Sequence, residues 1–334
     1  MSIRRAWFAL AVTVVWVALG TAVAVADPAG PTDYGSEVTS IEPDTGGFDI
    51  EIVGGDSFVS LTVESGVTIE VIGYSGEPYL RFGRGGVVEE NQLSPSKYLN
   101  EDRYASAEVP DTADAEARAA WTVVADNGSY AWHDHRTHWM NAIEPPGKAP
   151  GDQVAEGVIP LLVDGVEVDV TVVSVWQKPP SALPVVLGVT IGVLLTFATV
   201  RRRGQLINTV LIVAAVAATV AGVVGFLSVP AETGPRWALW ALPMTACAAG
   251  VVAVLGKSAL IALSRRTLQL LGALELVFWS VLRWPWLWAA LLPTGLPFWL
   301  DRLIGASVLV TAIGAVAATV AEMTSPGRTV SFRP

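Results

Sequence analysis

The sequence is poor in cysteine, histidine and charge. It contains one cysteine, Cys247, and three histidines among 334 residues, and 16% of its residues are charged. A single cysteine excludes an intrachain disulfide framework, so an exported domain has to rely on packing for its stability. Hydrophobic residues make up 52% of the chain, and the mean hydropathy is +0.49. This balance is too apolar for an ordinary soluble enzyme and predicts a membrane protein.

The few charges are segregated along the chain. Residues 27–178 hold 27 acidic and 8 basic residues, whereas the rest of the chain holds 4 acidic and 13 basic residues. The chain therefore joins an acidic half to a basic, apolar half. This arrangement argues against nucleic acid as a partner, because binding to phosphates needs a basic surface.

The N-terminus has the layout of a secretory signal. Two arginines precede an apolar core, and residues 24–26 read A-V-A, a typical cleavage site. We expect a signal peptide over residues 1–26, cut before Asp27. An uncleaved first transmembrane helix is the alternative, because the apolar run is long enough to cross a bilayer.

Apart from the N-terminal segment, the long apolar runs of the sequence all follow Pro179 and Pro180. Four of them predict membrane spans, at residues 182–200, 206–229, 237–256 and 303–321. The tryptophan-rich stretch between the last two predicts one tilted or Pro285-kinked helix with an interfacial segment. We expect a bundle of about five helices over residues 181–322 in the plasma membrane, with the lipid bilayer as its surroundings.

The distribution of positive charge predicts the orientation. Arginines follow the first span at 201–203, Lys257, Arg265 and Arg266 follow the third, and residues 323–334 form a basic tail. Positive loops face the cytoplasm, so we expect the acidic domain outside and the C-terminus inside. An outside start and an inside end require an odd number of spans, which supports the irregular fifth helix.

Residues 27–180 predict an extracytoplasmic, all-β, immunoglobulin-like sandwich. Short β-branched runs alternate with glycine, asparagine and aspartate, and two hairpin turns are expected at 126–128 and 164–165. The segment 90–118 is polar and predicts a long surface excursion. The expected strands lie at residues 48–54, 57–63, 67–73, 78–82, 121–133 and 158–176.

All three histidines fall within six residues, in the motif AWHDHRTHWM at 131–140. On a strand, His133 and His135 share a face, and a turn at residues 136–137 has to bring His138 back to them. Imidazole suits copper, zinc or nickel, and the thioether of Met140 favours copper. Asp134 lies on the opposite face, and the candidates to complete a ligand shell are Asp126, Tyr130 and Glu144.

A structural role is the alternative reading of the motif. Trp132 and Trp139 would anchor the core, Asp134 and Arg136 would form an ion pair, and the histidines would be hydrogen-bonded at the rim of the domain. A role in sensing pH is a further alternative. No nucleophile elbow, P-loop or dinucleotide fingerprint occurs in the sequence, so we expect no enzymatic activity.

Two segments carry a resemblance. GEPYLRFGRGGVVEENQLSPSKYLN at 76–100 together with WHDHRTHWM at 132–140, ahead of a few spans, resembles a group of uncharacterised exported membrane proteins of actinobacteria. The layout is also similar in outline to the copper-handling CopC and CopD proteins. This chain departs from them in lacking a mature N-terminal histidine and a methionine-rich loop, and in having fewer spans.

These observations predict a membrane-anchored metal-binding protein. Copper is the expected metal, with zinc as the alternative, and the expected ligands are His133, His135, His138 and Met140. A non-catalytic envelope scaffold with an envelope protein as its partner is the competing expectation. The glycine- and alanine-rich spans at 206–229 and 303–321 predict close helix packing or a homo-oligomer.

Overall fold

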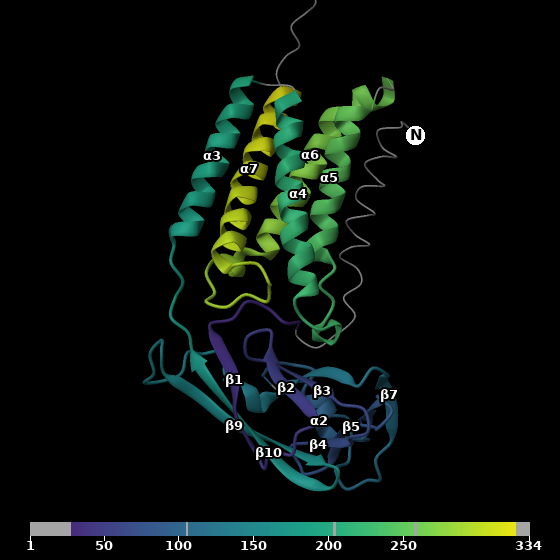
Figure 1. Cartoon of the computed structure of the whole chain (residues 1–334). Coiled ribbons are helices and arrows are strands. Elements are labelled where there is room, and N and C mark those ends of the chain that lie inside the picture. Colours follow the sequence, from purple (N-terminus) through teal and green to yellow (C-terminus); the bar gives the residue numbers. More distant parts are fainter. Residues whose placement is uncertain (1–27, 105, 203–204, 257–258, 325–334) are drawn as a thin grey trace, which may run out of the picture.

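The computed structural model describes residues 28–104, 106–202, 205–256 and 259–324. The predicted signal peptide and most of the predicted tail lie outside these residues. The described chain forms a β domain below a bundle of helices (Figure 1). This arrangement confirms the predicted all-β domain followed by an all-α membrane bundle.

The β domain consists of two antiparallel sheets. The seven-stranded sheet has the order β1-β10-β9-β4-β5-β6-β7, and the three-stranded sheet has the order β2-β3-β8. The large sheet comprises β1 (Tyr34–Glu42), β4 (Ile69–Ile72), β5 (Pro78–Phe82), β6 (Val88–Asn91), β7 (Trp121–Ala125), β9 (Gln153–Val163) and β10 (Val166–Trp176). The small sheet comprises β2 (Phe48–Val53), β3 (Phe58–Val63) and β8 (Ser129–His133).

The core of this domain is apolar and fills the space between the sheets. Alternate residues of the strands point inward, so Val59 and Leu61 of β3 are fully buried beside Val71 of β4 and Ile159 and Leu161 of β9. Trp132 of β8 belongs to the same core. The predicted anchoring role of Trp132 is therefore confirmed, whereas Trp139 is only half-buried.

One predicted hairpin is confirmed and the other is wrong. Strands β9 and β10 pair through Asp164 and Gly165, which both have positive φ, as a two-residue hairpin turn requires. The turn at 126–128 does not form a hairpin: β7 pairs with β6 in the large sheet, and β8 pairs with β3 in the small one. This turn therefore carries the chain from one sheet to the other.

Three short elements were not predicted. Strand β1 reads YGSEVTSIE and β6 reads VEEN, and the polar residues in both obscure the alternation. Helix α2 (Pro95–Leu99) lies inside the segment that was predicted as a surface excursion. Each of these elements depends on partners elsewhere in the fold. Strand β1, for example, is held along its whole length by β10.

Five long helices follow the β domain. They are α3 (Leu183–Arg202), α4 (Gln205–Leu227), α5 (Ala238–Leu255), α6 (Ala259–Leu282) and α7 (Phe298–Thr324). Four of them, α3, α4, α5 and α7, are long and apolar enough to cross a membrane, and they match the four predicted spans. The irregular fifth helix is α6, which ends before Pro285 at a 3-10 turn, η3 (Trp284–Leu287). Its 24 residues extend about 36 Å at 1.5 Å per residue, enough for a bilayer core of about 30 Å.

Small residues bring the helices close together. A side chain at Gly222 of α4 would fall on the main-chain carbonyl of Leu239, and one at Gly314 of α7 would fall on Thr196 of α3. The outward side chains of α3 are apolar and exposed, as expected of a surface in contact with lipid tails; Val186 and Leu194 are examples. The predicted close packing of the alanine- and glycine-rich spans is confirmed.

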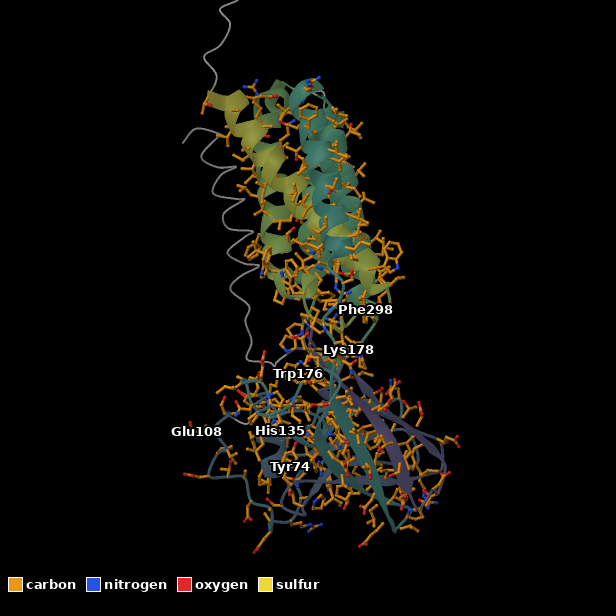
Figure 2. All side chains as sticks on the ribbon, turned by 90° about the vertical axis from the view of Figure 1, so that its left-hand side faces the viewer. Tyr74, Glu108, His135, Trp176, Lys178 and Phe298 are labelled. Carbon is orange, nitrogen blue, oxygen red and sulfur yellow. The ribbon has the colours of Figure 1, made fainter. Side chains whose placement is uncertain are left out.

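The two parts of the molecule touch along the segment that precedes β1. Thr32 and Leu291 exchange main-chain hydrogen bonds of 3.1 and 2.9 Å, and the main chain of Ala290 donates to the carboxylate of Asp33 at 2.7 Å. Trp176 and Lys178 lie at the same junction, below Phe298 (Figure 2). The β domain is therefore held against the ends of the helices.

Candidate metal centre

The histidine motif begins at the end of a strand and continues into a tight turn. His133 is the last residue of β8, and His135, Arg136 and Thr137 form the 3-10 turn η1. The carboxylate of Asp134 caps this turn by accepting from the main chain of Arg136 at 3.0 Å. The predicted turn at 136–137 is therefore confirmed, and it returns His138 to His133.

The three imidazoles form one cluster. One ring nitrogen from each of His133, His135 and His138 lies within 4.8 Å of the other two. The Nε2 atoms of His133 and His138 are 3.1 Å apart. Within the described part of the chain, these three residues are the group of His, Cys, Asp or Glu side chains that could share a metal ion. His133 and His138 are only 4% and 2% exposed, and His135 is half-buried.

Main-chain carbonyls fix the tautomers of the rings. His133 Nδ1 lies 3.2 Å from the Asn100 carbonyl oxygen, and His138 Nδ1 lies 3.0 Å from that of Trp139. A carbonyl oxygen only accepts, so each Nδ1 carries the proton and donates it. In a neutral imidazole the Nε2 atom then holds a lone pair. The two Nε2 lone pairs therefore face each other across 3.1 Å.

Burial keeps both of these rings neutral. Loss of solvation, then the neighbouring His138 and His135, lowers the pKa of His133 to about 3. Loss of solvation, then the guanidinium of Arg103, lowers the pKa of His138 to about 4. At neutral pH no proton is therefore bound between the two Nε2 atoms, and the site offers two unprotonated nitrogen donors.

His135 is held by different contacts. Its Nε2 lies 2.7 Å from the carbonyl oxygen of Asp102, so Nε2 is the protonated nitrogen and Nδ1 holds the lone pair. Its ring stacks on Tyr74, with centroids 5.7 Å apart and planes at 10°. Burial lowers the pKa of His135 as well. The third ring is thus also oriented and favoured in its neutral form.

A buried ion pair supports the turn from behind. Asp134 is fully buried, and its carboxylate lies 2.7 Å from Arg136 Nη2 and accepts from the indole of Trp132 at 3.0 Å. The nearby Arg136 outweighs burial and lowers the pKa of Asp134 to about 2. The predicted ion pair is confirmed, and its hydrogen bonds direct Asp134 away from the role of a metal ligand.

The structure brings together the three histidines and leaves the other candidate ligands with separate surroundings. Met140 lies at the surface, 36% exposed, two residues after the buried His138, so its thioether stays a prediction. The group that could share a metal in the described chain does not include Asp126 or Glu144. Tyr130 lies in β8 three residues before His133, packed against the apolar core.

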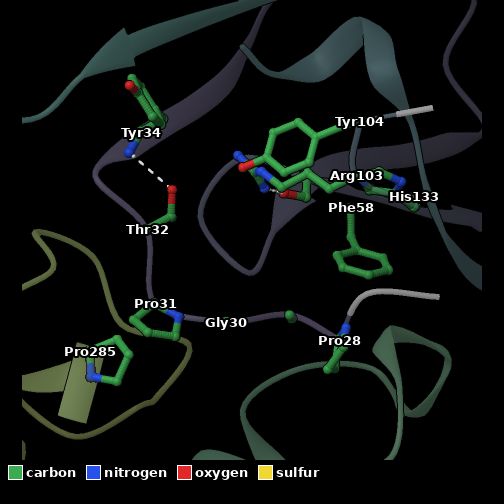
Figure 3. A pocket seen from close by; sticks show the side chains of 12 residues that line it. Pro28, Gly30, Pro31, Thr32, Tyr34, Phe58, Arg103, Tyr104, His133 and Pro285 are labelled. Carbon is green, nitrogen blue, oxygen red and sulfur yellow. Dashed lines mark hydrogen bonds between the residues drawn. The ribbon is translucent and has the colours of Figure 1, made fainter. Parts of the chain in front are cut away.

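His133 also lines a cavity that faces the helices (Figure 3). The cavity has a volume of about 350 Å³ and lies between the β domain and the end of the bundle. Arg103, which pairs with the buried Asp56, stands beside His133 in its wall, and Phe58 packs on the His133 ring. Its lining residues are Pro28, Ala29, Gly30, Pro31, Thr32, Tyr34, Ser57, Phe58, Arg103, Tyr104, His133 and Pro285.

Sequence reasoning missed the partners that orient the rings. The carbonyls of Asn100 and Asp102 come from a turn 33 residues before the histidines they contact. Every residue has a carbonyl, so residue type gives no signal for such contacts. The stacking of Tyr74 on His135 was equally hidden, although an aromatic residue at the end of β4 was visible in the sequence.

The sulfur-containing and acidic side chains of α5 and α6 have ordinary surroundings. Met244 is 47% exposed on the outside of α5, and Cys247 is partly buried against the core of the bundle. Glu275 accepts from the hydroxyl of Thr245 on α5 at 3.1 Å and so pairs with a polar group of another helix. Arg283 forms an ion pair with Asp301. These residues have packing and hydrogen-bonding roles.

Comparisons of the chain with protein-family models, with curated proteins and with solved structures find no match. The resemblance to exported actinobacterial proteins therefore stays a prediction, and the geometry of the histidine cluster is the basis on which a function is proposed.

Proposed function

We propose that this protein is a membrane-anchored, extracytoplasmic metal-binding protein that handles copper through His133, His135 and His138. It would serve as a metal sensor, a store or an accessory in uptake, with zinc as the alternative metal. The proposal assigns it binding and no catalysis. The observation that carries it is the facing pair of Nε2 atoms, 3.1 Å apart.

Two facing lone pairs repel each other unless a cation lies between them. A proton is a poor candidate at neutral pH, because burial lowers the pKa values of His133 and His138 to about 3 and 4. A metal ion fits better. Nitrogens bound to one ion at about 2.0 to 2.1 Å are about 3.0 to 3.5 Å apart, a range that includes the observed separation.

The outer contacts of the rings support the same conclusion. Metal-ligating histidines usually donate their second ring nitrogen to a carbonyl or carboxylate, which fixes the tautomer. All three rings here have that arrangement, with the carbonyls of Asn100, Asp102 and Trp139 as acceptors. The ring nitrogens of the three histidines are up to 4.8 Å apart, which is too far for one shared ion. The His135 ring therefore has to move toward the other two by about 1.5 Å before all three can bind the same metal.

The choice of metal rests on the type of ligand. Three neutral imidazoles suit copper and zinc, and the nearest carboxylate, Asp134, is already paired with Arg136. Met140 is two residues from His138 in the chain, and a thioether favours Cu(I). Copper is therefore the first choice.

The proposed orientation rests on charge. Arg201, Arg265 and Arg266 lie at the end of the bundle away from the β domain, and Arg266 pairs there with Glu322 of α7. Positive residues favour the cytoplasmic side, which leaves the acidic β domain outside. The cavity beside His133 would give an ion a route to the cluster from the membrane side of the domain.

Metal titration of the purified full chain tests the proposal. We expect one equivalent of Cu(I), Cu(II) or Zn(II) to bind the wild type, and a His133→Ala/His138→Ala variant to lose at least about tenfold in affinity. Met140→Leu measures the contribution of the thioether, and Arg84→Gln on the far side of the domain is the control. Equal affinity in the wild type and the double variant would refute the proposal.

A structural role is the second candidate, and the buried Asp134 network favours it. Asp134, Trp132, Arg136 and Tyr74 are linked by hydrogen bonds and stabilise the turn with or without a metal. In that case the domain would act as an envelope scaffold that contacts a protein partner. Full stability of the metal-free wild type combined with no metal binding would favour this reading.

A further inference from the structure

A cluster of buried arginines lies at the end of the bundle that faces the β domain. Arg236 precedes α5, Arg283 follows α6, and Arg302 is in the first turns of α7. All three are at most 6% exposed. They lie at the ends of three different helices, on the bundle side of the junction between the two parts.

Arg236 and Arg283 lie close together through shared neighbours, and Asp301 lies between Arg283 and Arg302. The Arg283 guanidinium stacks on Trp286 at 3.9 Å, and Trp286 packs against Gly225 of α4. The carbonyl of Gly225 accepts a hydrogen bond from Arg236. Asp301, which pairs with Arg283, immediately precedes Arg302. Burial, and then the nearby charge of Arg283, lowers the pKa of Arg236 to about 10.

The positive charge of the cluster exceeds its negative charge. Asp301 forms a salt bridge with Arg283, whereas Arg236 and Arg302 form none within the described part of the chain. Arg236 donates to the carbonyls of Gly225 and Pro293, and Arg302 donates to those of Ala289 and Ala290. Carbonyls are neutral, so two positive charges are buried without a counter-charge. Buried charges that lack a partner are strongly destabilising.

Several donors in the cluster also have no acceptor. Four donors, Arg236 Nη1, Arg283 Nε and Nη1, and Arg302 Nε, are buried and have no hydrogen-bond partner among the described residues, against one unpaired acceptor, Asp301 Oδ2. Buried polar groups in proteins are nearly always partnered. The first turns of α5 and α7 lie at this end of the bundle as well, and helix N-termini favour negative charge (Figure 1).

We infer that Arg236, Arg283 and Arg302 form a binding site for a phosphate group at the end of the bundle facing the β domain. A phosphate has the charge to neutralise the surplus and the oxygen acceptors to receive the free N–H groups. The neighbouring Trp284, Trp288 and Trp299 are about half-exposed, as residues at the lipid headgroup level are. The phosphate is therefore either inorganic or part of a lipid headgroup.

Thermal unfolding of the full chain in detergent, in the presence of a metal chelator, tests the site. We expect inorganic phosphate to raise the Tm in a saturable way, relative to gluconate at the same pH and ionic strength. Arg236→Gln should weaken the apparent affinity by about tenfold or more, because a charge-assisted contact is lost. Arg84→Gln, at an exposed ion pair in the β domain, should behave as the wild type.

A second variant changes the affinity in the opposite direction. Asp301→Asn frees Arg283 from its carboxylate, so the phosphate affinity should rise. This variant keeps the test decisive even if Arg236→Gln does not fold. A structural cluster of arginines predicts instead that neither variant alters the response to phosphate, and that result would overturn the inference.

A search for bound lipid distinguishes inorganic phosphate from a lipid headgroup as the ligand. Native mass spectrometry of the wild type should reveal a retained phospholipid if the site takes a headgroup, and Arg236→Gln should release it. If inorganic phosphate shifts the Tm and no lipid is retained, the ligand is the free ion. An absence of both the Tm shift and the retained lipid would refute the site.

Discussion

The β domain and the helical bundle treat buried polar groups in opposite ways. In the β domain, Asp134 and Arg136 compensate each other, and the three histidines are neutral with one nitrogen of each on a carbonyl. In the bundle, Arg236 and Arg302 are buried without a carboxylate partner. The difference underlies the two proposals made above: a cation between the neutral nitrogens, and an anion among the positive charges.

The largest expected effect comes from breaking the balance in the β domain. Asp134→Asn leaves Arg136 buried without its counter-charge, while the side-chain oxygen of the asparagine can still cap η1. We expect a loss of about 3 to 5 kcal/mol in the free energy of unfolding. Chemical denaturation of the full chain, followed by tryptophan fluorescence, measures it. Unchanged stability would show that Arg136 finds another partner or reaches water.

Acidification should weaken the metal-free β domain. His133 and His138 have pKa values of about 3 and 4 in the folded protein and about 6.5 when unfolded, so the unfolded state binds more protons between these values. Stability is therefore full above pH 6.5 and falls as the pH drops. Between pH 7 and 5 we expect a loss of about 2 kcal/mol for each ring.

Comparing thermal unfolding at pH 7 and pH 5 in a chelator checks this expectation. His133→Gln should abolish about half of the pH dependence. The pKa of Asp134 is about 2, so its carboxylate stays ionised between pH 7 and pH 5 and does not contribute to the change in stability. A pH-independent Tm would contradict the neutral state of the rings.

A smaller effect is expected from the packing of the bundle. Gly222→Ala puts a methyl group onto the Leu239 carbonyl, so α4 and α5 must separate, at a cost of about 1 to 3 kcal/mol. Gly225→Ala on the same helix has its nearest neighbour at 3.6 Å and is the matched control. The Tm of both variants in detergent makes the comparison, and equal values would contradict the close contact.

The smallest effect should come from an exposed ion pair. Arg84 and Asp164 are 3.4 Å apart, and both side chains are largely in solvent. Arg84→Gln should change the free energy of unfolding by less than about 1 kcal/mol. Comparison with Asp134→Asn measures how much more a buried charge pair contributes to stability than an exposed one. A loss above about 2 kcal/mol in the free energy of unfolding of Arg84→Gln would contradict the expected screening of this pair by solvent.

Much of the architecture could be predicted because it follows from local patterns. The four apolar runs became α3, α4, α5 and α7, and the tryptophan-rich stretch between the last two contains a further long helix, α6. The turn that returns His138 to His133 was also visible in the spacing. Strand β1 could not be found this way, because its polar sequence is a strand only through pairing with β10.

The contacts that give the candidate site its chemistry are long-range. The tautomers of His133 and His135 depend on carbonyls more than 30 residues away, and no pattern of side chains encodes such contacts. The wrong hairpin at 126–128 has a similar cause: the turn residues were recognised, but the partners of β7 and β8 are set by the two sheets. Local sequence determines where the chain turns, and tertiary packing determines what it meets.

The junction at Thr32 limits how the β domain can move. A body joined to another at one point can swivel, whereas each further attachment removes part of that freedom. The domain is hydrogen-bonded to Leu291 at Thr32 and continues covalently into α3 after Trp176, and the neighbouring Tyr34 pairs with Trp176. Ala29 also donates to the carbonyl of Thr233 at 3.0 Å, so the domain is attached at several places and the wall that contains His133 is held facing the helices.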